Sequence, residues 1–231
     1  MLRFENVLLQ QGQFKLRVDW TLPRGARLAV VGPSGAGKST LLSAVAGFLD
    51  PYEGCIFWET ARIDDQPPAK RPVTMLFQDH NLFGHLTAAQ NVSLGLNPSL
   101  KLNAEQTQSV EGALDRVGLG NYADRRPAAL SGGQQGRVAL ARALIRNRAL
   151  WLLDEPFSAL GPGLRREMLS LVSEMAENSG ATVLMVTHDP DDAVRFADYT
   201  VFVNDGVAQA PKLTNELFAD PPIELRAYLG T

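Results

Sequence analysis

The chain has 231 residues, of which 45% are hydrophobic and 20% are charged, and its formal net charge is −3. These values exclude a disordered chain and allow one large α/β domain, with or without an inserted subdomain. A slightly acidic chain without a concentrated basic segment is not expected to bind nucleic acid, because neutralising phosphates needs clustered lysine and arginine. Cys55 is the only cysteine, so an intrachain disulfide is excluded and a reducing compartment fits.

The sequence does not indicate insertion into a membrane. Residues 1–6 contain charge and lack the apolar run of a secretory signal. No apolar stretch approaches the roughly twenty residues that cross a bilayer as a helix. We therefore expect a soluble protein that reaches a membrane only through a partner.

The first third of the chain predicts strands and one helix. Strand-like stretches lie at residues 2–9, 14–22, 27–31, 55–58 and 73–77, and a helix is expected at 38–48. Apolar and polar residues alternate through 14–22, which indicates a half-exposed antiparallel strand. Residues 64–72 are polar and include three prolines, so they are interpreted as a surface connection.

Helical patterns dominate the middle of the chain, and strand patterns return after it. Helices are expected at 88–94, 103–117 and 133–146, with Asn103 as the N-cap of the second. We interpret residues 79–141 as a helical subdomain inserted into a single domain whose core is 1–78 and 142–231. Beyond it, strands are expected at 149–153 and 182–186, helices at 162–178 and 189–197, a hairpin at 199–209 and a helical tail from 213.

A glycine-rich loop lies between the strand at 27–31 and the helix from Lys38. It fits the pattern G-x-x-x-x-G-K-[ST], in which glycines let successive backbone N–H groups turn toward a polyphosphate. Lys38 is expected to bind the β- and γ-phosphates, and the Ser39 hydroxyl to bind Mg²⁺. The alternative is an ordinary glycine-rich turn, which the flanking strand and helix disfavour. The predicted nucleotide-binding residues here are Gly32, Pro33, Ser34, Gly35, Ala36, Gly37, Lys38, Ser39 and Thr40.

Two acidic residues follow the apolar strand at 149–153. A carboxylate at the C-terminal end of such a strand is suited to hold Mg²⁺ opposite the loop serine, so Asp154 is the predicted metal-side carboxylate. Glu155 would lie near the γ-phosphate and polarise an attacking water as a general base. The alternative is that this acidic pair is only a solvated strand end.

A third group of residues, Leu130-Ser131-Gly132-Gly133-Gln134, precedes the helix expected at 133–146. Ser131 is predicted to cap this helix, and the two glycines expose backbone N–H groups to an anion. One nucleotide needs only one phosphate loop. A second phosphate-binding segment therefore indicates one that contacts the ATP of another copy, through Ser131, Gly132, Gly133 and Gln134.

Together with Gln78 and His188, these ordered motifs make the chain resemble the ATP-binding subunits of ABC transporters over essentially its whole length. The resemblance implies a P-loop NTPase fold of the ABC ATPase type, with an antiparallel side sheet and an inserted helical subdomain. It also implies ATP hydrolysis with Mg²⁺ in a dimer that encloses two ATP molecules. The residues that the resemblance assigns to catalysis are Glu155, His188 and Gln78, and those around the metal are Ser39, Gln78 and Asp154.

Several stretches resemble, more narrowly, the ATPases of bacterial thiamine importers. They are residues 71–78, 81–83, 85–87, 94–98, 100–103 and 214–217. In that group this surface faces the membrane subunits, so the likeness bears on the permease and only indirectly on the solute. It implies import of thiamine or its phosphates, with permease subunits as partners and a periplasmic solute-binding protein as an indirect one. The implied location is peripheral, on the cytoplasmic face of the bacterial inner membrane.

The chain departs from the family pattern at three places. Gly161 stands where the family usually has an aspartate that is used across the dimer interface. Gly136 follows the signature and should weaken the helix start by up to about 1 kcal/mol relative to alanine. No aromatic residue occupies 9–11, where the one that stacks on adenine is expected, and Phe14 is expected to serve as strand core.

Other functions fit the motifs less well. An importer of another small solute, such as a polyamine, ferric iron or an inorganic anion, is the leading alternative. Non-transport relatives in DNA repair or translation usually carry long coiled-coil insertions or two fused ATPase halves, and this chain has neither. A P-loop kinase or GTPase would leave residues 130–134 unexplained.

Overall fold

The computed structural model describes residues 1–77, 81–158 and 160–230 of the chain. Twelve strands within these ranges form one curved sheet, and ten of them follow a single hydrogen-bonded path. In spatial order the path is β6 (Ala61–Arg62), β5 (Glu53–Trp58), β1 (Leu2–Gln11), β2 (Phe14–Val18), β11 (Val207–Ala208), β10 (Tyr199–Asn204), β4 (Arg27–Val31), β9 (Thr182–Val186), β8 (Leu150–Asp154) and β7 (Val73–Leu76). Two short strands lie off this path, since β3 (Thr21–Leu22) pairs with β1 and β12 (Lys212–Leu213) pairs with β10.

The sheet has an antiparallel part and a parallel part. β1 pairs antiparallel with β2, β3 and β5, whereas β10, β4, β9, β8 and β7 run parallel to one another. The parallel pairing of β11 with β2 joins the two parts. Because the carboxyl ends of parallel strands meet at one edge, the residues that follow β4, β8 and β9 lie close together.

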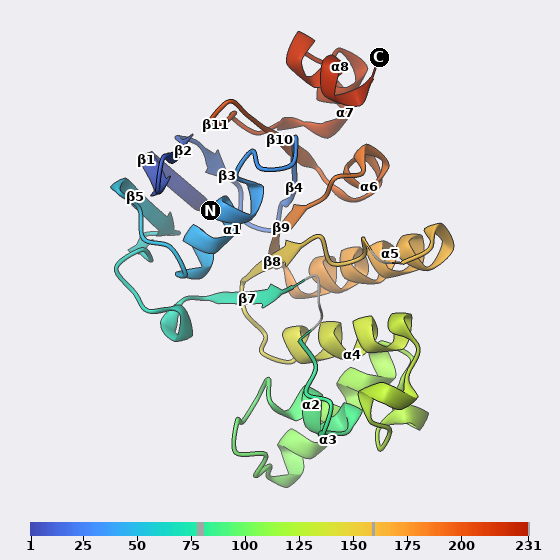
Figure 1. Cartoon of the computed structure of the whole chain (residues 1–231). Coiled ribbons are helices and arrows are strands. Elements are labelled where there is room, and N and C mark those ends of the chain that lie inside the picture. Colours follow the sequence, from blue (N-terminus) through green and yellow to red (C-terminus); the bar gives the residue numbers. More distant parts are fainter. Residues whose placement is uncertain (78–80, 159, 231) are drawn as a thin grey trace.

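Helices cover both faces of the parallel strands and form a separate layer below them (Figure 1). Around the sheet lie α1 (Lys38–Ala46), α5 (Pro162–Ser179), α6 (Pro190–Phe196), α7 (Thr214–Ala219) and α8 (Ile223–Leu229). The separate layer contains α2 (Ala88–Ser93), α3 (Ala104–Arg116) and α4 (Gly132–Leu144). Short 3₁₀ turns occur at Pro68–Lys70, Gly120–Tyr122 and Pro127–Ala129.

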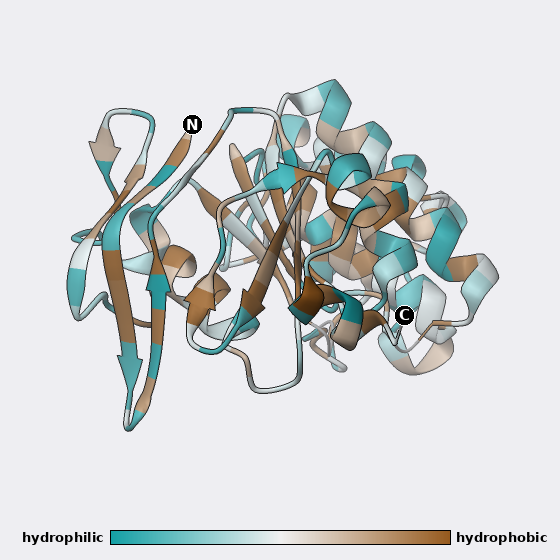
Figure 2. Cartoon of the chain, turned by 90° about the horizontal axis from the view of Figure 1, so that it is seen from above, coloured by the Kyte–Doolittle hydropathy of each residue, from teal (hydrophilic) through white to brown (hydrophobic). Residues whose placement is uncertain are grey.

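Each of these layers has its own apolar core. One cluster lies between α1, the antiparallel strands and one face of the parallel strands, and includes Leu41 and Leu184. A second lies on the opposite face under α5 and α6, and includes Met168 and Phe202. The helices α2, α3 and α4 bury a third, which includes Val92 and Leu114. Figure 2 shows the hydrophobic residues concentrated on the strands, with polar residues spread over the outer helices.

Most predicted elements are confirmed, with ends that shift by at most two residues. The strand expected at 14–22 is the main exception, because it is divided into β2 and β3. The division lies opposite an irregularity in β1, where the register shifts between Glu5 and Leu8 and Asn6 has φ 48°. The Asn6 N–H donates to the Asp19 side chain there. This side-chain contact replaces a regular backbone pairing, so β2 ends before it and β3 begins after it.

The helix predicted at 38–48 ends earlier, at Ala46. Gly47 follows in the left-handed conformation with φ 90°, a common helix ending because glycine adopts it without strain. The Arg71 guanidinium donates to the backbone oxygens of Ala44 at 2.6 Å and Val45 at 3.1 Å. A basic side chain thus satisfies carbonyls that the end of the helix leaves free.

Arg71 corrects the interpretation of residues 64–72 as a surface connection. Its side chain is only 1% exposed, and it also donates to the backbone oxygens of Gln66 and Asp64. Burial lowers the pKa of Arg71, and the nearby carboxylates of Asp64, Asp50 and Asp65 oppose that shift. Five of the nine residues of the segment are exposed, but one arginine joins it to the end of α1.

Within the described residues, no helix is both long and apolar enough to span a membrane.

Candidate active site

The phosphate loop joins the end of β4 to the start of α1, and three glycines in it adopt positive φ. Gly32 has φ 149°, Gly35 has φ 77° and Gly37 has φ 104°. A Cβ at Gly32 would collide with the backbone oxygen of Val203 in β10. The glycine pattern in the sequence therefore reflects both backbone conformation and close packing of the loop against the sheet.

Lys38 is folded over this loop. Its ammonium group donates to the backbone oxygens of Gly32 at 2.7 Å and Pro33 at 2.8 Å, and the side chain is buried. Burial lowers the pKa of Lys38, while the nearby Glu155 and Asp154 carboxylates oppose the shift. A buried ammonium group beside a ring of backbone N–H groups is suited to binding a polyphosphate.

Ser39 and Asp154 meet across the gap between α1 and β8. The Ser39 hydroxyl donates to Asp154 Oδ1 at 3.0 Å. Burial raises the pKa of Asp154, the Ser39 hydrogen bond and the Lys38 charge lower it, and the Glu155 charge raises it further. A hydroxyl and a carboxylate oxygen within hydrogen-bond distance are the hard oxygen donors that Mg²⁺ prefers, so these residues fit that ion.

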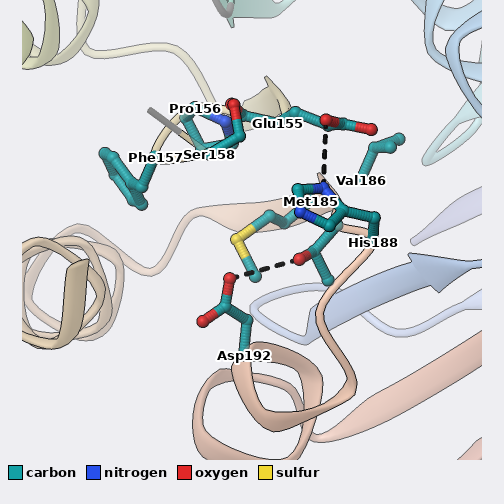
Figure 3. A pocket seen from close by; sticks show the side chains of 9 residues that line it. Glu155, Pro156, Phe157, Ser158, Met185, Val186, His188 and Asp192 are labelled. Carbon is teal, nitrogen blue, oxygen red and sulfur yellow. Dashed lines mark hydrogen bonds and ion pairs between the residues drawn. The ribbon is translucent and has the colours of Figure 1, made fainter. Parts of the chain in front are cut away.

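Glu155 and His188 form the second polar pair of the site. Glu155 Oε2 lies 3.1 Å from His188 Nδ1, and both side chains point toward the same space (Figure 3). The Glu155 backbone has φ 45°, which is unusual for a residue with a side chain, and its N–H donates to the Val186 oxygen of β9. Strain of this kind is often found at functional sites, where the surrounding structure holds it.

A cavity of about 10 Å³ lies beside this pair. Its lining includes Glu155, Ser158, His188 and Asp192 (Figure 3). This volume is at the lower limit for a cavity that can hold one water molecule.

The segment 131–134 lies at the start of α4. Ser131 is the N-cap, as predicted, and accepts a hydrogen bond from the Gln134 N–H at 3.3 Å, while the Ser131 N–H donates to the Gln134 side chain at 2.9 Å. Ser131 and Gly132 are exposed, and a Cβ at Gly132 would meet open space. Gly133 is buried instead. It packs so closely against α5 that a Cβ at this position would collide with Leu164.

The family model described as ABC transporter matches residues 16–158. This match includes the phosphate loop, the segment 131–134 and the acidic pair at Asp154 and Glu155. The chain belongs to the ABC transporter family.

Full-length relatives within this family share high identity with the chain. A protein named thiamine import ATP-binding protein from Cereibacter sphaeroides is 57% identical over 230 residues, with 100% of both chains covered. A protein of the same name from Escherichia coli K12 is 48% identical, with 95% of this chain and 94% of the relative covered.

Solved structures of ABC cassettes share the fold. The ADP conformation of MJ1267, an ATP-binding cassette of an ABC transporter, is 27% identical with a TM-score of 0.89 and covers 100% of this chain and 99% of that one. A dimeric post-hydrolysis state of the cassette MJ0796 with bound ADP and Pi is 30% identical with a TM-score of 0.79, covering 93% and 99%. The predicted fold, an ABC-type P-loop ATPase domain, is thereby confirmed.

In this ABC ATPase the structure brings together most of the residues that the sequence assigns to the nucleotide site. The phosphate loop, Asp154, Glu155 and His188 converge at the carboxyl edge of the parallel strands. Residues 131–134 lie on another element, and no hydrogen bond within the described ranges joins them to the phosphate loop. Gln78, predicted near the metal, lies outside the described residues.

Sequence reasoning missed Arg165 of α5. Its guanidinium donates to Asp189 Oδ2 at 2.6 Å and to the Ser158 backbone oxygen at 3.2 Å, and it lies 3.8 Å from Asp192. It therefore connects the loop after Glu155 with the loop that carries His188. The apolar pattern of α5 predicts the helix, but no local signal in the sequence marks one of its arginines as half-buried and bonded to two loops.

The stretches that resemble thiamine importers do not all lie on one surface. Arg71 is buried under α1, Thr74 donates to the Ala143 backbone oxygen, and Thr214 is buried against Thr200. These three residues hold elements of the fold together. At these positions the similarity to thiamine importers therefore reflects packing within the chain, and not a surface that binds the permease. Phe83 and His85 are exposed, as a docking face requires.

Proposed function

We propose that this ABC ATPase is the energy-coupling subunit of an importer for thiamine or its phosphates. The observation that carries the proposal is the 57% identity, over both full lengths, with a protein named for thiamine import. The site geometry supports the ATPase part independently, since a buried lysine, a serine–carboxylate pair and a glutamate–histidine pair meet at one sheet edge. The solute itself would not touch this chain.

In the proposed reaction, the phosphate loop and Lys38 hold the polyphosphate of ATP. Glu155 accepts a proton from a water molecule as the water oxygen attacks the γ-phosphorus, and the bond to the bridging oxygen of ADP breaks. His188 is hydrogen-bonded to Glu155 and orients it. Mg²⁺, held from the protein side by Ser39 and Asp154 and, we propose, Gln78, supplies charge neutralisation at the phosphate oxygens.

A second copy of the chain would complete each site. Ser131 and Gly132 are exposed at the start of α4, where helix N–H groups point outward and favour an anion. MJ0796, a relative by structure, forms a dimer in its ADP- and Pi-bound state. We propose a two-fold dimer here, with residues 131–134 of each copy on the γ-phosphate held by the other.

The permease subunits would bind to a surface near Phe77, the residue before Gln78. Phe48 is 61% exposed, Phe83 is 49% exposed, and the Phe48 and Phe77 rings lie 6.3 Å apart. Exposed aromatic side chains grouped in this way are typical of protein interfaces. Through these subunits the chain would be peripheral to the cytoplasmic face of the inner membrane and would act with a periplasmic solute-binding protein. The division into a core and a helical subdomain at 79–141 is part of the same proposal.

Uptake measurements in a strain that lacks the gene and cannot make thiamine test the solute. We expect loss of labelled thiamine uptake, with uptake of sulfate, iron and polyamines unchanged. Plasmid-borne wild-type protein should restore uptake, and the Lys38→Ala variant should not. Normal thiamine uptake in the deletion strain would contradict the substrate assignment and leave the ATPase assignment intact.

A further inference from the structure

The C-terminal helix α8 reaches the loop that carries His188. The Tyr228 hydroxyl donates to the backbone oxygen of His188 at 3.1 Å. The helix is anchored by Leu225, which is fully buried in the cluster under α5 and α6, and the Tyr228 ring packs 6.0 Å from the Phe202 ring of β10. A segment far from the motifs in sequence thus contacts the site directly.

The Tyr228 hydroxyl lies near groups of the active site that affect its pKa. Burial raises the pKa of Tyr228, and the negative charges of Glu155 and Asp189 raise it further. The Gly32 backbone at the start of the phosphate loop opposes this shift. Tyr228 therefore remains protonated near neutral pH and keeps its hydrogen for the His188 oxygen.

His188 needs such support because its own side chain is half exposed. The side chain has 53% of its surface exposed and is joined to Glu155 through Nδ1. Arg165 holds the next residue, Asp189, and Thr187 on the other side bonds to Asp192. Tyr228 holds the backbone of His188 itself, between these two contacts.

We propose that Tyr228 is a positioning residue for ATP hydrolysis, which sets the orientation of His188 toward Glu155 from the C-terminal helix. The proposal rests on the proposed roles of Glu155 and His188. It does not require Tyr228 to touch ATP. It assigns a function to the C-terminal tail, which the sequence motifs leave without one.

The first test is ATP hydrolysis by the full chain with Tyr228→Phe. This variant removes the hydroxyl and keeps the ring on Phe202, so we expect kcat to fall about fivefold, as for the loss of one hydrogen bond, with KM for ATP unchanged. Tyr122→Phe is the matched control, because Tyr122 lies in the helical layer under the Arg125 guanidinium. It should retain the parental kcat. An unchanged kcat in Tyr228→Phe, or an equal loss of ATP affinity, would overturn the proposal.

The second test is independent of activity and uses the imidazole NMR resonances. The chain has only three histidines, so each resonance can be followed, and His188→Gln identifies the one from His188. In Tyr228→Phe we expect that resonance to move and the other two to remain. Thermal unfolding of the variant should be close to that of the parent. A His188 resonance that stays in place would contradict a positioning role.

Parallel assays of Glu155→Gln and His188→Ala test the roles of Glu155 and His188 separately from the role of Tyr228. If either variant hydrolyses ATP at the parental rate, the role proposed for that residue is wrong, whatever Tyr228→Phe does. If both lose activity while Tyr228→Phe keeps its rate and its His188 resonance, only the inference about Tyr228 is wrong.

Discussion

The phosphate-loop side of the site and the segment 131–134 differ in how their polar groups are satisfied. On the phosphate-loop side, side chains from α1, β8 and the loop after β9 bond to one another or to the loop itself. In the segment 131–134, the described side-chain hydrogen bonds of Ser131 and Gln134 lie only within their own capping box. The first region is an organised site, and the second is a capped, exposed helix start.

This difference fits the proposal that residues 131–134 act on a nucleotide held by another copy. The phosphate-loop side contains the buried Lys38 and the positive-φ residue Glu155, which the proposed hydrolysis would use. The segment 131–134 is held by the contact of Gly133 with Leu164 and by the ion pair of Arg137 with Glu167 at 2.6 Å. Under the proposed dimer, an exposed helix start with this fixed packing would be preorganised to meet a nucleotide held by another copy.

The largest expected effect comes from Glu155→Gln, which breaks the chemistry on the phosphate-loop side. Glutamine keeps the size of the side chain but cannot accept the proton, so kcat should fall by about 100-fold or more. Phosphate release at saturating ATP measures it. Glu174→Gln, an exposed change on α5, should keep the parental rate. Parental activity in Glu155→Gln would show that Glu155 is not the base.

The second prediction breaks the other region. In the Glu155→Gln background we expect a monomer without nucleotide and a dimer with ATP and Mg²⁺ by light scattering. Adding Ser131→Arg should abolish the dimer while ATP still binds the monomer, because the side chain would fill the space meant for phosphate. The control is Asn103→Arg, which destroys an equivalent capping box at the start of α3. If Ser131→Arg dimerises normally, the shared-site arrangement is wrong.

A third prediction tests the support at the C-terminal end of α1. Replacing Arg71 with methionine removes hydrogen bonds to four backbone oxygens, two of them buried and two part-buried, so the free energy of unfolding should fall by roughly 2–4 kcal/mol. Urea unfolding measures the change. Lys70→Met, one residue earlier and exposed, should change it by less than about 0.5 kcal/mol. Equal stabilities of the two variants would contradict the role of Arg71 as the cap of α1.

Asp154→Asn should increase the stability of the fold and remove the ATPase activity. The folded pKa of Asp154 is raised, so the folded state binds more protons than the unfolded state, and its stability falls as pH rises through that window. Asparagine removes the buried charge and still accepts from Ser39. We therefore expect a higher melting temperature at pH 8, a smaller gain at pH 4, and loss of Mg²⁺-dependent hydrolysis. A lower melting temperature at pH 8 would contradict the cost assigned to this carboxylate.

The smallest expected effect concerns the base of the nucleotide. Phe14 packs so closely under Gly37 that a Cβ there would lie 2.6 Å from its ring, and it belongs to the apolar core. Phe14→Ala should therefore weaken ATP and GTP binding alike, and the two nucleotides should compete within about fivefold in the parent. Base stacking would instead give about 1–3 kcal/mol of preference. A strong ATP preference that Phe14→Ala removes would place the ring under adenine.

Much of this molecule could be predicted because its signals are local. Strand β9 was predicted with both ends correct, since a short run of β-branched residues, leucine and methionine without charge indicates a buried parallel strand. The capping boxes at Asn103 and Ser131 follow from residues three positions apart. The residues of the phosphate loop and the acidic pair follow from motifs whose chemistry requires those residue types.

Local patterns along the chain are therefore enough to predict the order of elements, the nucleotide motifs and the family. The burial of Arg71, the connection that Arg165 makes between two loops of the site, and the contact of Tyr228 with His188 arise only in the folded chain. The partners in these contacts lie 24 to 40 positions apart along the chain. An arginine or tyrosine on an amphipathic segment has the same local pattern whether it meets solvent or a distant carbonyl, and packing alone selects between them.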